Sequence, residues 1–185
     1  MGIVDRAKKV VVIGDVFADM ISKVQGFPET GGRTFGTSFM RNSGGTGGNI
    51  AAGLAVLGMK ASIVCGLGDD ENGEFLLEEL KQSGVNTEHV KVTAGLKSGA
   101  VPILVDEDGE RVIYVLVKGS AFEAIEPEDL LFLEEMNPDA LCFTGVIIGA
   151  HPVEESAILA ARRWKGRAKL YFDPNLCYPA DQVPE

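Results

Sequence analysis

The sequence has little of several features that define common protein classes. Its 185 residues include 3 cysteines, 2 histidines and 1 tryptophan, with 17 lysines and arginines against 27 aspartates and glutamates. The net charge of −10, and the lack of a basic run longer than Arg162-Arg163, argue against a nucleic-acid partner. An acidic chain can still bind a nucleotide through backbone N–H groups at helix starts, so a nucleotide ligand is not excluded.

The cysteines are few, odd in number and widely spaced. Cys65, Cys142 and Cys177 suit neither a disulfide framework nor a zinc site, and they indicate free thiols in a reducing compartment. Four of the first nine residues are charged, and no apolar run approaches the ~20 residues that cross a bilayer. We therefore expect a cytoplasmic protein with no membrane partner and no zinc site.

Alternating strand and helix signals run along the chain. Four short apolar runs predict strands buried on both faces of a parallel sheet, and they cover residues 10–13, 61–65, 140–144 and 168–172. Four helices are predicted, over residues 49–57, 72–83, 127–136 and 152–165, with Gly after the first two and Pro opening the last two. This order indicates one α/β domain with a doubly wound, mostly parallel sheet.

Two segments interrupt that alternation. Residues 31–43 have no helical period and suggest a pair of strands, and residues 98–118 predict a β-hairpin around the turn at Asp108 and Gly109. Pro102 suits an edge strand. Together the two segments are expected to form a small sheet that acts as a lid over the carboxyl ends of the core strands, where α/β sheets bind ligands. The alternative is that the hairpin only caps a sheet edge.

The strongest local signal is the run SGGTGGN over residues 43–49, which leads directly into a predicted helix. Glycine lets a backbone approach a ligand closely, and the first N–H groups of a helix can donate to its oxygens. The run lacks the lysine of a phosphate-binding P-loop, and Ile50 replaces the third glycine of the dinucleotide fingerprint. The run alone leaves open a tight turn with close helix packing.

Other motifs in the same order make the pattern specific. Gly14 and Asp19 follow the first strand, residues 66–73 read GLGDDENG, residues 84–87 read GVNT and residues 173–175 read DPN. With the glycine run, this series resembles the ribokinase-like, or PfkB, family of carbohydrate kinases. The resemblance implies a ribokinase-like α/β fold with a β-sheet lid.

The resemblance also implies a function and a set of site residues. Such a protein would use ATP and Mg²⁺ to phosphorylate a hydroxymethyl group of a sugar or nucleoside. Asp19 would accept hydrogen bonds from two substrate hydroxyls, a task that suits an acceptor-only carboxylate. Gly44, Gly45 and Asn49 would contact the same substrate. The alternatives are a solvent-facing turn aspartate at 19 and a helix N-cap at 49.

Further polar residues carry weaker signals. Asp173 and Asn175 are weaker substrate-binding candidates, because they match the D-P-N motif of the family. Asp69 and Asp70 precede a helix, so capping is expected of them rather than catalysis. The two histidines stand far apart and no G-x-S-x-G motif occurs, so a hydrolase is not indicated.

Two substitutions depart from the family pattern. Thr46 stands where ribokinases carry lysine, so the resemblance does not imply ribose specificity. Cys177 replaces an arginine of many members, which makes a sugar acid a less expected substrate. A dinucleotide-binding oxidoreductase is disfavoured, because the glycine run does not follow the first strand directly.

Two motifs of the family's catalytic half do not occur in these 185 residues. They are the N-x-x-E segment that organises Mg²⁺ and the G-A-G-D segment with the general base, which we expect beyond Glu185. We assign no catalytic and no metal-binding residue to the chain. Residues 1–185 are expected to be an incomplete kinase domain that binds sugar, is inactive alone and forms a homodimer through the lid sheet. The alternative is a non-catalytic sugar-binding or dimerising module derived from such a kinase.

Overall fold

A four-stranded parallel sheet forms the body of the molecule in the computed structural model, which describes residues 8–175. In spatial order the strands are β10 (Lys169–Asp173), β9 (Ala140–Thr144), β1 (Lys9–Ile13) and β4 (Lys60–Val64). Each coincides with a predicted apolar run to within one residue. Val11, Val12 and Ile13 of β1 are 0% exposed, which confirms that the central strand is covered on both faces. The same expectation is wrong for β10, whose residues are exposed because it is an edge strand.

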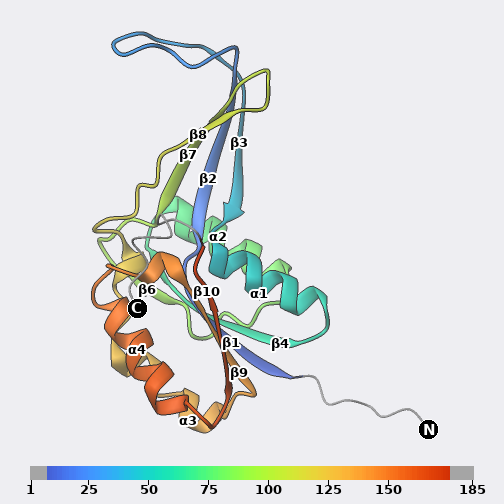
Figure 1. Cartoon of the computed structure of the whole chain (residues 1–185), viewed down its shortest axis with the longest axis vertical. Helices are drawn as coiled ribbons and strands as arrows, with labels where there is room; N and C mark the ends of the chain where they lie inside the picture. The colour runs from blue at the N-terminus through green and yellow to red at the C-terminus, as the bar shows by residue number, and fades with distance from the viewer. Residues whose placement is uncertain (1–7, 176–185) are drawn as a thin grey trace, which may run out of the picture.

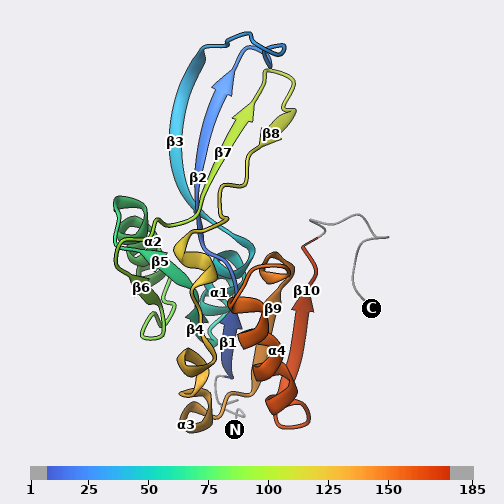
Figure 2. The same ribbon diagram turned by 90° about the vertical axis from the view of Figure 1, so that its left-hand side faces the viewer.

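Helices cover both faces of this sheet (Figure 1, Figure 2). α1 (Thr46–Val56) and α2 (Glu71–Gln82) pack with Val12, whereas α4 (Val153–Trp164) packs with Val11 and Ile13. Successive side chains of a strand point to opposite faces, so β1 contributes to both hydrophobic layers. The doubly wound α/β fold is therefore confirmed. No helix within residues 8–175 has the length and apolar composition needed to cross a membrane.

One predicted helix is divided in two. Residues 127–136 form the 3-10 helix η2 (Pro127–Leu130) and the short α3 (Leu133–Met136). Hydrogen bonds between residues three apart, such as that from the Leu131 N–H to the Glu128 carbonyl (3.2 Å), keep the first part in the tighter 3-10 form. The remaining short elements are β5 (Gly66–Gly68), β6 (Lys91–Thr93), η1 (Ala121–Glu123) and η3 (Gly145–Ile147).

A second sheet projects from the body beyond the carboxyl end of β1 (Figure 1, Figure 2). Its spatial order is β3 (Gly36–Gly44), β2 (Phe17–Val24), β7 (Ala100–Val105) and β8 (Arg111–Ile113). The strand pair expected within residues 31–43 is wrong, because that segment contributes only β3. Its antiparallel partner is β2, which was not predicted as a strand. The mixed sequence FADMISKV, with two charged residues, masks the alternation of β2.

The expectation that Pro102 marks an edge strand is also wrong. Strand β7 lies between β2 and β8, so it has a neighbour on each side. The Tyr114 N–H donates to the Pro102 carbonyl at 2.9 Å, but proline has no N–H to donate in return. β8 accordingly ends at Ile113, and its pairing with β7 resumes only at an isolated bridge between Ala100 and Leu116. The sheet accommodates the proline by interrupting this ladder.

Candidate functional site

A buried carboxylate, Asp15, joins three elements at the carboxyl end of the main sheet. It lies two residues after the end of β1 and is 1% exposed. Its carboxylate accepts hydrogen bonds from the Thr46 N–H (2.7 Å), the Gly47 N–H (3.2 Å) and the Thr144 hydroxyl (2.8 Å). A negative charge against the first N–H groups of a helix is favourable. Asp15 therefore ties β1 to the start of α1 and to the end of β9.

Glycines of the run, together with Gly14 before Asp15, allow this close approach. At Gly47, an added Cβ would lie 2.8 Å from the Asp15 backbone, and at Gly14 it would lie 2.7 Å from the Thr144 hydroxyl. Gly45 has φ 88, in the left-handed region that side chains avoid. The packing role that the run left open is therefore real for these glycines.

The first N–H groups of α1 are already used within the protein. Besides those of Thr46 and Gly47, the Gly48 N–H donates to the Asp15 carbonyl (2.9 Å) and the Asn49 N–H to the Gly45 carbonyl (3.0 Å). This helix start is therefore not a phosphate cradle of the P-loop kind. Among the described residues, no acceptor is found for the Gly45 N–H, which stays available to a ligand.

Asp19 lies on β2, at the base of the second sheet, and not in a turn. An added Cβ at Gly44 would clash with the Asp19 carboxylate, so the two residues are in contact. Asp19 is half-buried, and within residues 8–175 its carboxylate receives no hydrogen bond. Burial, and secondarily the charge of Asp15, raises the pKa of Asp19. An accessible, unpartnered carboxylate in a partly desolvated position is suited to accept hydrogen bonds from a ligand.

Asn49 lies in the first turn of α1 and is exposed. The N-cap of this helix is Gly45, so the capping role considered for Asn49 is wrong. The structure links Asn49 to the glycine pair through its backbone N–H. In the part of the chain that is described, its side chain forms no hydrogen bond to Asp19.

Asp173 and Asn175 lie at the carboxyl end of β10. Asp173 pairs in register with Thr144 of β9, which bonds to Asp15, so the same sheet edge contains all three. The Asp173 carboxylate accepts the Asn175 N–H at 2.9 Å, and Asn175 is left-handed with φ 52. Asp173 also lines a cavity of about 660 Å³ between α1 and β10. The D-P-N motif thus forms a tight turn at the carboxyl end of β10, two strands away from β1.

The carboxylates of the GLGDDENG motif have structural contacts. Asp70 caps α2 by accepting the Gly73 N–H (2.9 Å), and it also accepts the Ser98 hydroxyl (2.7 Å) and N–H (3.1 Å) just before β7. Burial raises the pKa of Asp70, but these hydrogen bonds outweigh it and hold the pKa below its ordinary value. Asp69 instead accepts the Gly95 N–H at 2.9 Å. The capping role is confirmed for Asp70, which also anchors the start of β7.

Residues 8–175 contain no cluster of three or more His, Cys, Asp or Glu side chains that could hold a metal ion. They therefore do not fit a Mg²⁺ site of their own. Cys65 and Cys142 are free thiols, and burial raises the pKa of each. Cys177 lies outside the described residues.

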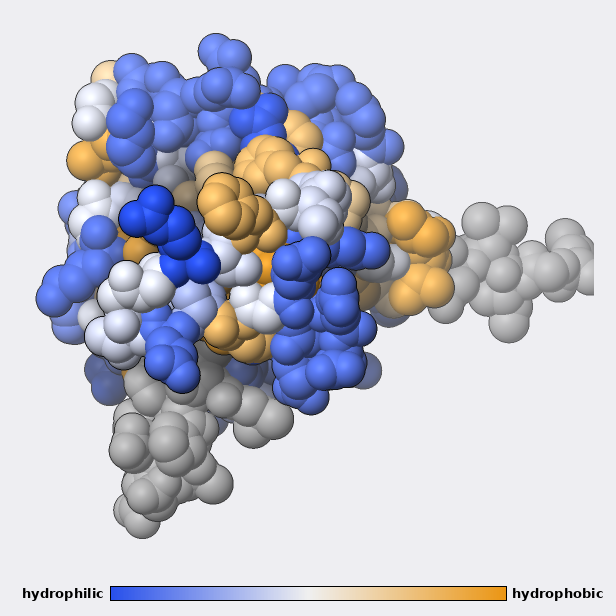
Figure 3. Space-filling view, turned by 90° about the horizontal axis from the view of Figure 1, so that it is seen from above, coloured by the Kyte–Doolittle hydropathy of each residue, from blue (hydrophilic) through white to orange (hydrophobic). Residues whose placement is uncertain are grey.

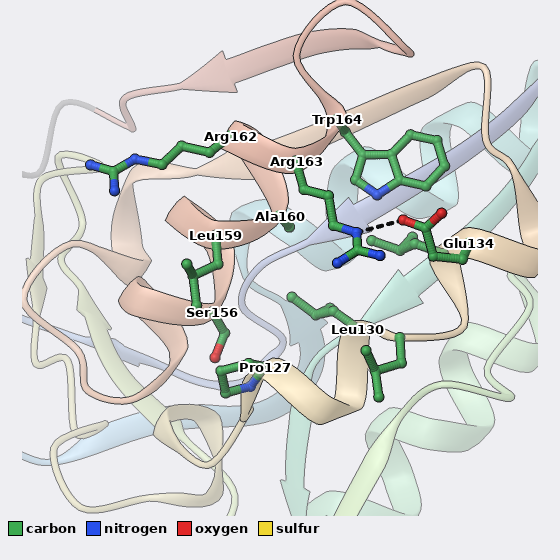
Figure 4. Close-up of a pocket in the computed structure, with 11 residues that line it drawn as sticks. Pro127, Leu130, Glu134, Ser156, Leu159, Ala160, Arg162, Arg163 and Trp164 are labelled. Carbon is green, nitrogen blue, oxygen red and sulfur yellow. Dashed lines mark hydrogen bonds and ion pairs between the residues drawn. The ribbon is translucent and has the colours of Figure 1, made fainter.

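A separate cavity of about 480 Å³ lies between η2 and α4 (Figure 4). Leu130 and Trp164 contribute to its apolar lining, and the Arg163–Glu134 ion pair at 2.6 Å lies beside it. None of the predicted site residues lines this cavity. It is therefore a feature apart from the Asp19 site.

Sequence reasoning assigned no role to Asp15, the residue that organises the site. The available signal was an aspartate two residues after a buried strand, a position whose side chain can meet the carboxyl ends of neighbouring strands. Its partner Thr144 lies 129 residues further along the chain.

Comparison of the sequence and fold with known proteins identifies a family of sugar kinases. The profile of the pfkB family carbohydrate kinases matches residues 7–184. The chain is 34% identical to a ribokinase of Mus musculus over 126 residues, covering 68% of this chain and 38% of that protein. It is 33% identical to an ATP-dependent ribose-1-phosphate kinase of Halopiger xanaduensis over 166 residues, covering 90% of this chain and 54% of that protein.

Solved structures share the fold. A sugar kinase of Pyrococcus horikoshii in complex with ATP superposes with a TM-score of 0.78 at 24% identity, covering 93% of this chain and 54% of that one. A ribokinase of Thermotoga maritima gives a TM-score of 0.78 at 23% identity, covering 96% and 55%. The chain spans about half or less of the length of these relatives. With the family profile matched over nearly its whole length, the chain belongs to the pfkB family of carbohydrate kinases.

Proposed function

We propose that this chain is the N-terminal, sugar-binding part of an ATP-dependent carbohydrate kinase. The kinase would transfer the γ-phosphate of ATP to a hydroxymethyl group of a sugar or nucleoside. The observation that carries the proposal is the Asp19 carboxylate, which contacts Gly44 and has no hydrogen-bond partner among residues 8–175. Family membership supplies the reaction class.

In this proposal the described residues bind and orient the acceptor sugar. Asp19 accepts hydrogen bonds from two hydroxyls, and the free N–H of Gly45 donates to a third oxygen. The Asn49 side chain, exposed on the first turn of α1, is a further contact. Asp173 and Asn175 are weaker candidates at the same sheet edge. Because phosphoryl transfer depends mainly on positioning and electrostatic stabilisation, a fixed acceptor hydroxyl is this chain's contribution.

ATP and Mg²⁺ enter the proposal through the family alone. The described residues offer no Mg²⁺ site, and the N–H groups of α1 are occupied. We therefore propose that residues 1–185 alone have no kinase activity, and we derive no catalytic step from them. We keep the cytoplasm as the proposed location, on the free thiols.

The second sheet is proposed to be a lid over the sugar and the contact surface of a homodimer. It and the residues that flank its strands carry exposed apolar side chains, among them Phe39 of β3 (66% exposed), Phe35 just before β3 (80%) and Tyr114 just after β8 (55%). The view of the molecule from above in Figure 3 shows hydrophobic residues on the surface between hydrophilic ones. Exposed apolar surface of this kind supports a role in binding a ligand or a partner.

Calorimetric titration of the chain with ribose, fructose, 2-keto-3-deoxygluconate and adenosine tests the proposal. We expect one of these to bind, and Asp19→Ala to weaken its affinity by about 1.5–3 kcal/mol, or about 10- to 150-fold. Asp108→Ala, which removes an exposed carboxylate at the tip of the same sheet, is the matched control and should bind normally.

The outcomes separate the alternatives. An unchanged dissociation constant in Asp19→Ala would remove Asp19 from the site. A parallel assay with ATP and Mg²⁺ should show no phosphorylated product, and turnover would refute the proposed inactivity. Binding without turnover agrees with both the kinase part and the non-catalytic module. Adding the catalytic half of a related kinase and recovering turnover would favour the first.

A further inference from the structure

The pairing of β2 with β3 places a second polar residue beside Asp19. In this antiparallel ladder Asp19 is directly opposite Asn42, and Phe17 is opposite Gly44. Residues opposite one another share a face of the sheet, and Gly44 contacts the Asp19 carboxylate on that face. Asn42, two residues before Gly44 on the same strand, therefore points to the side on which Asp19 lies.

The amide of Asn42 is available to a ligand. Its side chain is exposed and forms no hydrogen bond within the described part of the chain. Asparagine is depleted in strands, because its short polar side chain packs poorly on a pleated surface. Packing therefore gives no reason for an asparagine at this position, whereas recognition of a polar group does.

The two side chains have complementary chemistry. An ionised carboxylate only accepts hydrogen bonds, so a hydroxyl bound to Asp19 donates its proton and keeps its lone pairs. The carboxamide of Asn42 offers two N–H donors for such a lone pair. Opposite residues of an antiparallel ladder have Cβ atoms about 4.5–5.5 Å apart, so both side chains can reach one small ligand.

Apolar residues surround the pair on the same face. Ile21 and Met40 lie on β2 and β3, two residues from Asp19 and Asn42, and Val101 of β7 is in register with Asp19. Val101 is 7% exposed and belongs to the hydrophobic core. In a site with few polar groups and apolar surroundings, these polar groups determine which ligands bind, because a ligand that lacks a matching group leaves one of them without a hydrogen bond.

We propose that Asn42 is a specificity-determining residue: its side-chain amide donates to the oxygen of a hydroxyl in a vicinal diol that Asp19 holds. The ligand class is a sugar or nucleoside with two adjacent free hydroxyls. This inference rests on the proposed function, since it assumes that Asp19 binds the sugar.

The test measures the coupling between Asn42 and one substrate hydroxyl. The sugar that the wild-type chain binds most tightly, and its monodeoxy analogues, are titrated into wild type, Asn42→Ala and Asn42→Val. Loss of a neutral hydrogen bond should weaken binding of the parent sugar about 2- to 12-fold. One deoxy analogue, which lacks the hydroxyl bound by Asn42, should bind wild type and variants equally.

Two variants serve as controls for an effect of the substitutions on folding. Valine favours strands, so Asn42→Val keeps β3 while removing the amide. Ser22→Ala on the opposite face of β2 should retain wild-type affinity for every analogue.

The outcomes distinguish this inference from the proposed function. Equal weakening of the parent sugar and all deoxy analogues shows a merely structural role and overturns the inference. Sugar binding that depends on Asp19 and is unchanged in both Asn42 variants overturns the inference alone. If the wild-type chain binds no sugar, the proposed function fails and the inference fails with it.

Discussion

Replacing Asp15 by alanine removes the acceptor of three hydrogen bonds at the carboxyl end of β1. Two of the donors, the Gly47 N–H and the Thr144 hydroxyl, belong to buried residues, whereas Thr46 is partly exposed and can be hydrated. An unsatisfied buried donor costs about 1–3 kcal/mol. We therefore expect Asp15→Ala to lower the free energy of unfolding by about 3–5 kcal/mol, at the upper end of what single substitutions do.

Two further variants measure how much individual hydrogen bonds of Asp15 contribute to the free energy of unfolding. Asp15→Asn keeps the shape and one acceptor oxygen but turns the other position into a donor, so a loss of about 1–3 kcal/mol is expected. Thr144→Val removes only the hydroxyl donor and should cost about 1 kcal/mol. Because Asp15 and Thr144 contact one another, the double variant should cost less than the sum of the singles.

Urea unfolding followed by tryptophan fluorescence measures these changes. Trp164 is the only tryptophan of the sequence and is 1% exposed, so its emission should shift on unfolding. A loss below about 1 kcal/mol in Asp15→Ala would refute the reasoning, because it would mean that water satisfies the donors. Strict additivity of Asp15→Ala and Thr144→Val would show that their hydrogen bond is not formed in solution.

Two other substitutions test the site. Gly44→Ala should abolish sugar binding, because the added methyl group clashes with the Asp19 carboxylate. Gly53→Ala, whose added methyl group meets nothing within 4 Å, should bind sugar normally. Equal calorimetric affinities of the two variants would contradict the contact between Gly44 and Asp19. Since the pKa of Asp19 is raised by burial and then by Asp15, the folded state binds its proton more tightly than the unfolded state, and stability is lost as pH rises through the folded pKa. Asp19→Asn should therefore have a higher melting temperature than wild type at pH 7, and this difference should vanish below the ordinary pKa of 3.8. Calorimetric scans that show equal melting temperatures at pH 7 would exclude a raised pKa of Asp19.

Much of the body of the fold was predictable because its signals are local. The strands β1, β4 and β9 are apolar runs, since a parallel strand covered on both faces needs apolar side chains on both. β10 was predicted from a similar run, although it lies exposed at the edge of the sheet. The N-cap role of Asp70 was predictable for the same reason, because it depends on Gly73 three residues away. The start of α1 was predicted three residues late, since the acceptor for its first N–H group is Asp15, 31 residues earlier in the chain.

The second sheet was only partly predictable. The β7–β8 hairpin has a local turn signal, but the pairing of β2 with β3 does not. Pro102 suggested an edge strand from its missing N–H, yet the structure keeps neighbours on both sides and breaks the β7–β8 ladder instead. Which strands become neighbours depends on how the chain returns to the sheet, and no short segment encodes that.

The sequence by itself determined the α/β class, the order of the core elements and, through its ordered motifs, the family resemblance on which Asp19 and the glycine pair are proposed to bind a sugar. These follow from local patterns of apolar, glycine and capping residues. Only the tertiary structure decided that Asp15 joins β1 to α1 and β9, that Asp19 contacts Gly44 and that Asn42 stands opposite Asp19. The reason is physical, because strand register and burial arise from contacts between residues far apart in the chain.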